Sequence, residues 1–324
     1  MTRRVVGIAM AVVLGAGVVA QAQNLTYAKG QNVSPAYEGW EEDSAGRKFF
    51  VFGYMNRNWE EELDVPVGAD NRFTTGTPDQ GQPTHFLPRR NRFTFRVPVP
   101  AGFTDKDEIV WSLTTKGKTE QAFASLRLDY KIDDVVKASE TGALGAGSSS
   151  PEVRANTPPV IEVQGPRRLE VRVGQPVSLV MTVRDDGIPK ARAIGAGAAV
   201  ENEGSATNLS AANLKQVDVL RARRLLLPPA RVTVGKVVGL HTSWYVYRGA
   251  GKVTFDRDQI AAWEDTRNGG NSPWAPHWRA PELPADGRVP TTATFHAPGE
   301  YVLRAHADDG ALGADQSVTI VVKP

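Results

Sequence analysis

The clearest hydrophobic pattern in the chain lies near its C-terminus. From Leu303 to Ala307 apolar residues alternate with Arg304 and His306, which is typical of a β-strand with one face in a core and the other in water. Asp308-Asp309-Gly310 follows as a hairpin signal, and Ser317–Val322 is a run rich in β-branched residues. The pattern predicts that these two segments form an antiparallel strand pair.

Similar runs predict strands along most of the chain. In 92–99 the alternation predicts that Phe93, Phe95 and Val97 are buried while the arginines face water. The predicted strands before residue 135 are Lys48–Tyr54, Glu62–Val67, Arg92–Val99, Glu108–Thr115 and Gln121–Tyr130. Those after residue 158 are Val160–Val163, Leu169–Val173, Val177–Val183 and Leu240–Tyr247.

These elements predict an all-β chain of two antiparallel β-sandwich domains of the immunoglobulin or fibronectin type. The N-terminal domain spans 23–134 and the C-terminal domain spans 158–324. The segment 135–157 is rich in Gly, Ser and Ala and has few large apolar side chains, so it predicts a flexible linker. Two insertions, 188–238 and 249–290, interrupt the predicted strands of the second domain.

The predicted core of the second domain brings Leu179, Trp244 and Leu303 together. In immunoglobulin domains a Trp packs on a disulfide, and a Tyr two residues before the second Cys forms a corner. Here Tyr301 holds the corner position and Leu303 takes the place of that Cys. The chain contains no cysteine, which also excludes thiolate metal sites and cysteine nucleophiles.

The second domain resembles PKD and related bacterial immunoglobulin-like modules. The chain departs from the PKD pattern after the tryptophan, where Tyr245-Val246-Tyr247-Arg248-Gly249 replaces a Phe-Gly-Asp-Gly turn. The whole chain resembles secreted bacterial proteins of unassigned function, which implies a compartment and a fold but no activity. The PKD resemblance rests on Asn156-Thr157-Pro158-Pro159-Val160, Val173-Gly174, Asp185-Asp186-Gly187, Trp244, Pro298-Gly299-Glu300-Tyr301 and Ala307-Asp308-Asp309-Gly310.

Residues 1–22 have the layout of a secretory signal: two arginines, an apolar run and the cleavage site Ala20-Gln21-Ala22. The alternative is a membrane anchor, which the short, glycine-containing apolar run disfavours. We therefore expect a secreted or periplasmic protein without a stable membrane span. Cleavage removes Arg3 and Arg4 and no acid, so the mature chain is formally neutral and nucleic acid is not an expected partner.

The two Asp-Asp-Gly turns are the candidate metal site. Strands B and F of an immunoglobulin-type Greek key end at the same pole, so Asp185, Asp186, Asp308 and Asp309 are expected near one another. Clustered hard oxygen ligands suit Ca²⁺. The alternative is that both turns use Asp and Gly only for their turn chemistry.

Three tryptophans in the second insertion are the candidate ligand-binding residues. Trp263, Trp274 and Trp278 lie among prolines and glycines, where exposed indole faces would stack on sugar rings or on a partner protein. Alternatively, the tryptophans anchor their own loop.

Sequence motifs for catalysis are missing: the chain has no Gly-x-Ser-x-Gly elbow, and no two histidines have metal-ligand spacing. The leading hypothesis is an exported, non-catalytic binding or structural protein that recognises protein or glycan through loops. The alternative is a secreted hydrolase or carbohydrate-active accessory protein, with a site built from the loops 68–88 and 249–290.

Overall fold

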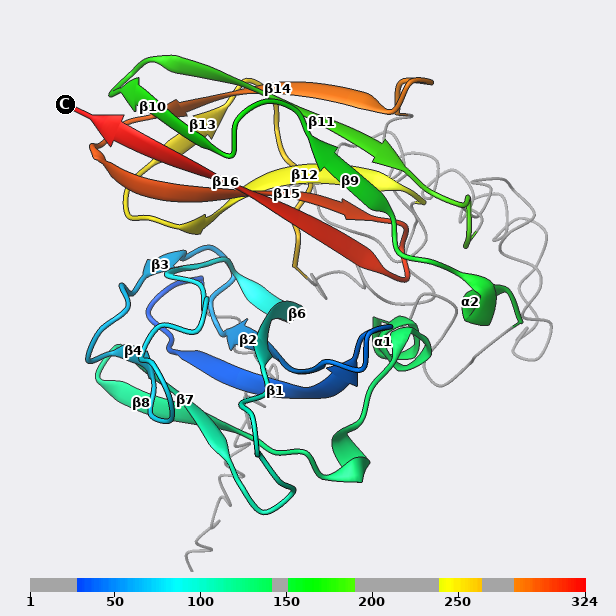
Figure 1. Ribbon diagram of the computed structural model, residues 1–324. Coiled ribbons are helices and arrows are strands. Elements are labelled where there is room, and N and C mark those ends of the chain that lie inside the picture. The colour runs from blue at the N-terminus through cyan, green and yellow to red at the C-terminus, as the bar shows by residue number, and fades with distance from the viewer. Residues whose placement is uncertain (1–27, 142–150, 190–238, 264–282) are drawn as a thin grey trace, which may run out of the picture.

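The computed structural model describes residues 28–141, 151–189, 239–263 and 283–324, most of which lie in strands and the turns between them (Figure 1). The sheets form two groups, which we call the N-terminal and C-terminal sandwiches. The prediction of an all-β chain with antiparallel sheets is confirmed. The predicted signal at 1–22 and most of both predicted insertions lie outside the described residues.

The N-terminal sandwich contains two three-stranded sheets, ordered β1-β2-β6 and β4-β7-β8, and the small sheet β3-β5. Phe52 of β2 and Trp111 of β7 meet edge to face between the larger sheets, with ring centroids 6.0 Å apart. Such aromatic pairs add to the stabilisation that comes from burying their area. The strands are β1 (Val33–Glu42), β2 (Lys48–Asn56), β3 (Leu63–Asp64), β4 (Asn71–Phe73), β5 (His85–Phe86), β6 (Arg89–Pro98), β7 (Ile109–Thr115) and β8 (Lys118–Ala124).

The C-terminal sandwich packs two four-stranded sheets, ordered β10-β16-β15-β12 and β13-β14-β11-β9. All neighbouring strands are antiparallel except β10 and β16, which are parallel. The strands are β9 (Val160–Val163), β10 (Arg168–Arg172), β11 (Pro176–Arg184), β12 (His241–Arg248), β13 (Val253–Phe255), β14 (Arg288–Phe295), β15 (Gly299–Asp308) and β16 (Gly313–Lys323).

The predicted core of the C-terminal sandwich is confirmed. Leu179, Trp244 and Leu303 are buried in one apolar cluster. The predicted hairpin is also present, because β15 and β16 pair from Gly299↔Val322 to Asp308↔Gly313. The Tyr301 hydroxyl donates to the carbonyl oxygens of Ala297 and Ala250. The tyrosine corner therefore forms in a domain that has no disulfide.

Strand β6 departs from its predicted register. Phe95 and Val97 are buried as predicted, but Phe93 is not part of the core. The pairing with β2 jumps between Phe52↔Phe95 and Tyr54↔Asn91, so residues 92–94 bulge out of the sheet. The backbone of Phe93 has a positive φ of 50°. The bulge breaks the alternation on which the prediction depended.

The segment 135–157, which the sequence predicts to be a flexible linker, contains helical residues near both of its ends. Helix α1 (Asp134–Thr141) and helix α2 (Pro151–Ala155) fall within or at the edge of 135–157. Ala138 of α1 is buried against Ala311 and Leu312 in the turn between β15 and β16. Small side chains allow a close approach, so a segment without large apolar residues still packs. A single 3-10 turn, η1 (Leu128–Tyr130), precedes α1.

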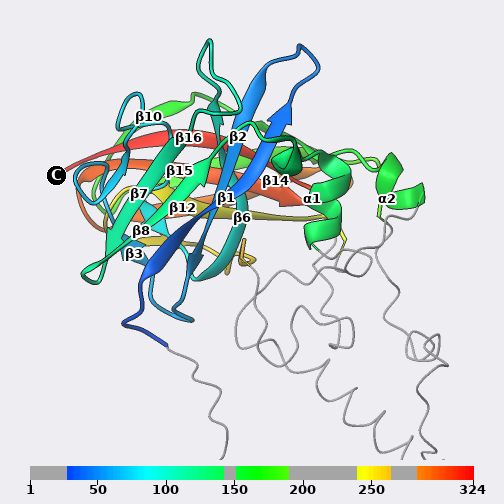
Figure 2. The same cartoon turned by 90° about the horizontal axis from the view of Figure 1, so that it is seen from below.

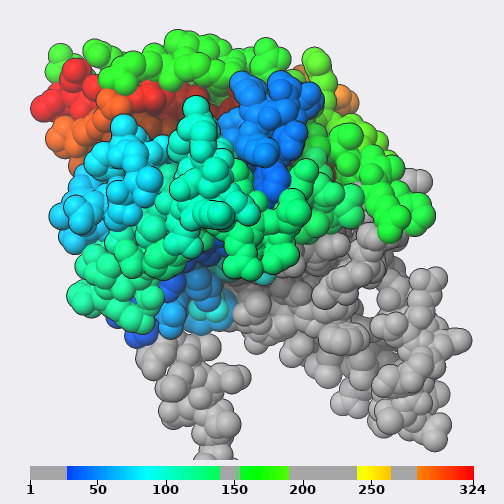
Figure 3. Space-filling view, turned by 60° about the horizontal axis from the view of Figure 1, so that its bottom comes forward, coloured from blue at the N-terminus to red at the C-terminus, as the bar shows by residue number. Residues whose placement is uncertain are grey.

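The two sandwiches pack directly on each other. Figure 1 shows the sheet that contains β12, β15 and β16 facing the N-terminal strands. Viewed from below, the strands of the two sandwiches cross at a steep angle (Figure 2). The space-filling view shows their atoms in contact along the boundary (Figure 3). Tyr247 of β12 belongs to the N-terminal apolar core, and Tyr245 and Val302 pack against that core.

Candidate functional site

Several specific contacts join the two sandwiches at their boundary, and the loop 79–84 of the N-terminal sandwich supplies many of them. The Thr84 amide donates to the Tyr247 carbonyl at 3.2 Å, and the Gly249 amide donates to the Thr84 hydroxyl at 3.0 Å. The Tyr247 hydroxyl donates to the Gly81 carbonyl. The loop therefore satisfies backbone groups along the outer edge of β12, which is a common way to protect a sheet edge.

Arg248 fixes the same loop electrostatically. Its two terminal nitrogens bind the two carboxylate oxygens of Asp79 at 2.7 and 3.0 Å, and its Nε donates to the Gln82 carbonyl at 2.8 Å. Two parallel charge-assisted bonds fix the orientation of a guanidinium. The Arg248 hydrogen bond holds the pKa of the Asp79 carboxyl below its usual value.

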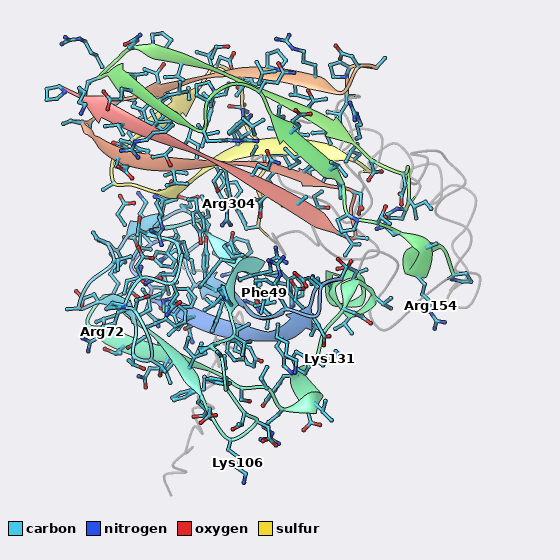
Figure 4. All side chains as sticks on the ribbon, in the orientation of Figure 1. Phe49, Arg72, Lys106, Lys131, Arg154 and Arg304 are labelled. Carbon is cyan, nitrogen blue, oxygen red and sulfur yellow. The ribbon has the colours of Figure 1, made fainter. Side chains whose placement is uncertain are left out.

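Arg304 of β15 is the central side chain of the junction and points from the C-terminal sandwich toward the N-terminal one (Figure 4). Its guanidinium lies 3.5 Å from the centroid of the Tyr247 ring and donates to the Thr94 carbonyl in the β6 bulge. Only 11% of this side chain is exposed. Burial opposes its charge, but Tyr247, Tyr245 and Asp315 outweigh that effect and raise the Arg304 pKa.

The bulge that receives Arg304 is built around a glycine. A side chain at Gly53 of β2 would meet the Asn91 carbonyl at 2.4 Å and the Glu38 carboxylate. Glu38 sits at a second bulge, in β1, and forms an ion pair with Arg90 at 2.6 Å. Asn91 is buried and donates to the Pro88 carbonyl at 3.0 Å. Bulges of this kind redirect residues at functional surfaces, and here one directs the Thr94 carbonyl toward the C-terminal sandwich.

His85 belongs to β5 and connects the small β3-β5 sheet to the loop 79–84, which contacts β12. Its Nδ1 lies 2.7 Å from an Asp64 oxygen and its Nε2 lies 3.2 Å from a Glu62 oxygen. The residue is 8% exposed. Burial opposes the charged ring, but the hydrogen bonds to Asp64 and Glu62 outweigh it and raise the His85 pKa to about 9. His85 is therefore a buried imidazolium held between two carboxylates at neutral pH.

A cleft opens on the surface where the sandwiches meet. Its volume is about 330 Å³. Asp64, Asp79 and Glu300 bring three carboxylates to its wall beside Arg248, but Asp64 is paired with His85, Asp79 with Arg248 and Glu300 with Arg168. The remaining lining residues are Pro66, Val67, Thr84, Gly249, Ala250 and Val302.

The two Asp-Asp-Gly turns lie on either side of the segment that leads into β9. The Asn156 amide donates to Asp309 at 3.0 Å, while the Thr157 amide and hydroxyl donate to Asp186 at 3.0 and 2.7 Å. Asp185 and Asp308 accept from the glycine amides of their own turns, at 2.8 and 2.6 Å respectively. These bonds are what the turn-chemistry alternative requires.

Within the described residues, no three His, Asp or Glu side chains are grouped so that they could hold a metal ion. Two buried oxygens at this pole nevertheless lack a hydrogen-bond partner, Oδ1 of Asn156 and Oδ1 of Asp185. Burial raises the Asp309 pKa to about 7, although its carboxylate accepts hydrogen bonds from the Asn156 side chain and from the Ala311 and Leu312 amides. Calcium binding remains a prediction, and it now involves Asn156, which the sequence analysis did not single out as a ligand.

The structure describes only one of the three tryptophans that the sequence predicts to bind a ligand. Trp263 is half-buried, and its indole nitrogen is buried without a hydrogen-bond partner. Trp274 and Trp278 lie outside the described residues. Recognition by these three residues therefore remains a prediction.

Sequence reasoning missed the junction altogether. It assigned Arg304 and His306 to a water-facing side of their strand, whereas both are largely covered, with side chains 11% and 15% exposed. The available signal was the placement of Tyr245 and Tyr247 on the face of β12 opposite the core residues Trp244 and Val246. Large aromatic residues on both faces of a strand indicate that each face is covered.

Comparisons with known proteins give no family: no protein-family model matches the chain, and no curated protein matches it. Solved structures built of immunoglobulin-like β-sandwiches match at very low identity. The S-layer protein rSbsC(31-844) is 10% identical with a TM-score of 0.22, and the match covers 90% of this chain and 28% of that one. The titin I-band fragment I67-I69 is 10% identical, with coverages of 90% and 64% and a TM-score of 0.20.

The D00-D0 domain of intimin is 8% identical with a TM-score of 0.22, and the match covers 90% of this chain and 100% of that one. These scores are too low to support an argument about this chain. The fold assignment therefore rests on its own sheets and register. Among the described residues, no helix is long and apolar enough to cross a membrane.

Proposed function

We propose that this chain is an exported, non-catalytic binding or structural protein whose two β-sandwiches act as one fixed unit. The observation that carries the proposal is the junction. Arg304 stacks on Tyr247 and binds Thr94, and the loop that ends at Thr84 follows β12. A desolvated cation on an aromatic face, with bidentate ion pairing nearby, holds two modules in one orientation. Fixed orientation suits a protein that presents loops to a partner or spaces other components.

We further propose that the partner is a protein or a glycan and that the mature chain lies outside the cytoplasm. The formally neutral charge after signal removal supports this class over nucleic acid. The loops of both sandwiches at the junction supply polar and apolar groups on one surface. Binding proteins commonly place recognition loops on rigid scaffolds.

Export is tested by fractionating cells that produce the full chain and measuring the intact mass of the exported form. We expect the mature protein to begin at Gln23. A membrane-bound form that still contains Met1 would exclude cleavage.

Binding is tested with the same material on glycan arrays and by crosslinking on intact cells. Saturable binding to a protein or glycan without turnover is expected. Hydrolysis of a bound glycan or ester by the purified chain would instead favour the secreted hydrolase.

A further inference from the structure

The junction contains a buried histidine, His85, that lies between two carboxylates. Along the cleft, Asp79 is paired with Arg248 and Glu300 with Arg168. His85 is different, because one imidazole serves two carboxylates, Glu62 and Asp64. Loss of one proton leaves a ring nitrogen lone pair directed at a carboxylate.

His85 is mechanically connected to the junction. Asp64 and His85 are directly paired across β3 and β5. The preceding residue, Thr84, donates its amide to Tyr247, and its carbonyl accepts the Val65 amide at 2.8 Å. Any separation of β3 from β5 therefore moves the backbone that docks on β12. Asp64 itself lines the junction cleft beside Glu300 and Val302.

We propose that Glu62, His85 and Asp64 form a protonation-dependent clasp, which keeps the junction closed while the imidazole is charged and loosens it when the proton is lost. Such a clasp gives the chain a way to change the relative position of its two sandwiches, which the binding or structural function proposed above does not include. Arg248 and Glu300 of the C-terminal sandwich and Asp79 of the N-terminal one line the cleft together with Asp64. Tyr301 of the C-terminal sandwich also interacts electrostatically with Asp64.

The sign of the His85 pKa shift determines at which pH the clasp is closed. The His85 pKa is raised from 6.5 to about 9 in the folded chain. A raised pKa means that the stabilisation is fully present below pH 6.5 and is lost as the pH rises through about 9. The clasp is therefore closed at neutral and mildly acidic pH and opens under alkaline conditions.

The test is hydrogen–deuterium exchange of the full mature chain between pH 7 and pH 10, corrected for intrinsic exchange rates, with histidine NMR on the same samples. We expect peptides covering 79–86 and 247–250 to lose protection about tenfold for each pH unit as the pH rises toward the His85 midpoint of about 9, and to lose no more above it, as a one-proton linkage requires. Peptides from β7 and β11, away from the junction, should keep theirs over the same range.

Variants separate the clasp from a general effect of alkali. His85→Gln should show raised exchange in both junction segments already at pH 7, with no further pH dependence. Asp64→Asn should move the His85 NMR midpoint and the exchange midpoint together to lower pH. His296→Gln is the matched control, because His296 is exposed and its ring is hydrogen-bonded to the hydroxyl of Thr254, away from the clasp; it should behave as the wild type.

Three results would overturn the proposal. The first is unchanged junction protection in the wild type across the whole range. The second is wild-type pH dependence in His85→Gln. The third, which decides the matter even if His85→Gln does not fold, is an exchange midpoint in Asp64→Asn that does not follow the His85 midpoint.

Discussion

Among single residues, Arg304 is the one on which the proposed fixed junction depends most. Its charge is buried between an aromatic ring and a backbone carbonyl, and its ion-pair partner Asp315 is 3.7 Å away. A cation in such a setting is stabilised by the ring quadrupole as well as by hydrogen bonding. No local pattern predicts this contact, because the ring and the carbonyl belong to strands more than 150 residues apart along the chain.

We expect Arg304→Ala to lower the free energy of unfolding by about 2 to 4 kcal/mol, because it removes the desolvated cation–π contact and leaves the Thr94 carbonyl without the donor it has in Arg304. Chemical denaturation followed by circular dichroism measures the loss. Arg72→Ala is the control, because Arg72 is exposed on β4; it should change stability by no more than about 0.5 kcal/mol. Equal effects of the two substitutions would mean that Arg304 is not buried.

The core of the C-terminal sandwich gives a second prediction at this scale. Trp244 is 2% exposed and packs in the cluster that contains Leu179 and Leu303. Trp244→Ala should cost about 3 to 5 kcal/mol, the range for a large aromatic removed from a core. Leu128→Ala is the matched control, since Leu128 is 79% exposed. An unchanged melting curve for Trp244→Ala would place the tryptophan outside the core.

Among the elements, the buried faces of strands with regular alternation were predictable, whereas the positions of the bulges were not. The alternation in β11 and β15 predicts both their existence and their buried faces. Strand β1 was missed because the bulge between Tyr37 and Gly39 interrupts its period. Helix α1 was missed because it packs through Ala138, whose burial contributes little apolar area. The junction of the sandwiches depends on such irregular elements, and so it could not be predicted locally.

The two Asp-Asp-Gly turns carry the prediction at this scale. If the free oxygens of Asn156 and Asp185 bind Ca²⁺ together with Asp309, then Ca²⁺ should raise the melting temperature progressively with the logarithm of its concentration, and a chelator should reverse the rise. The double substitution Asp186→Asn with Asp308→Asn should reduce this response, because it removes two negative charges and keeps the turn chemistry.

Asp105→Asn is the control, because it makes the same Asp-to-Asn change at an exposed position of the N-terminal sandwich. Its calcium response should equal that of the wild type. Calorimetric scans with chelator and with millimolar Ca²⁺ measure the effect. Identical scans for the wild type would show that the turns serve only as turns.

At the scale of the whole molecule, the feature that matters is the fixed relation of the sandwiches. Residues from both contribute to one apolar cluster, in which Tyr247 is buried beside the N-terminal core. Intramolecular module interfaces are commonly small and polar and permit relative motion. Here the core extends across the boundary, and ion pairs flank it at Arg248 and Arg304. We therefore expect the two sandwiches to form a single rigid body at neutral pH.

The most direct test of that claim is a distance distribution measured across the junction by pulsed electron paramagnetic resonance. The chain contains no cysteine, so Lys106→Cys in the N-terminal sandwich and Glu170→Cys in the C-terminal one, both at exposed positions, allow clean spin labelling of the full mature chain. At pH 7 we expect one narrow distribution, which Arg304→Ala broadens. A broad or multiple distribution in the otherwise unmodified labelled chain would show that the sandwiches move independently and would contradict the account.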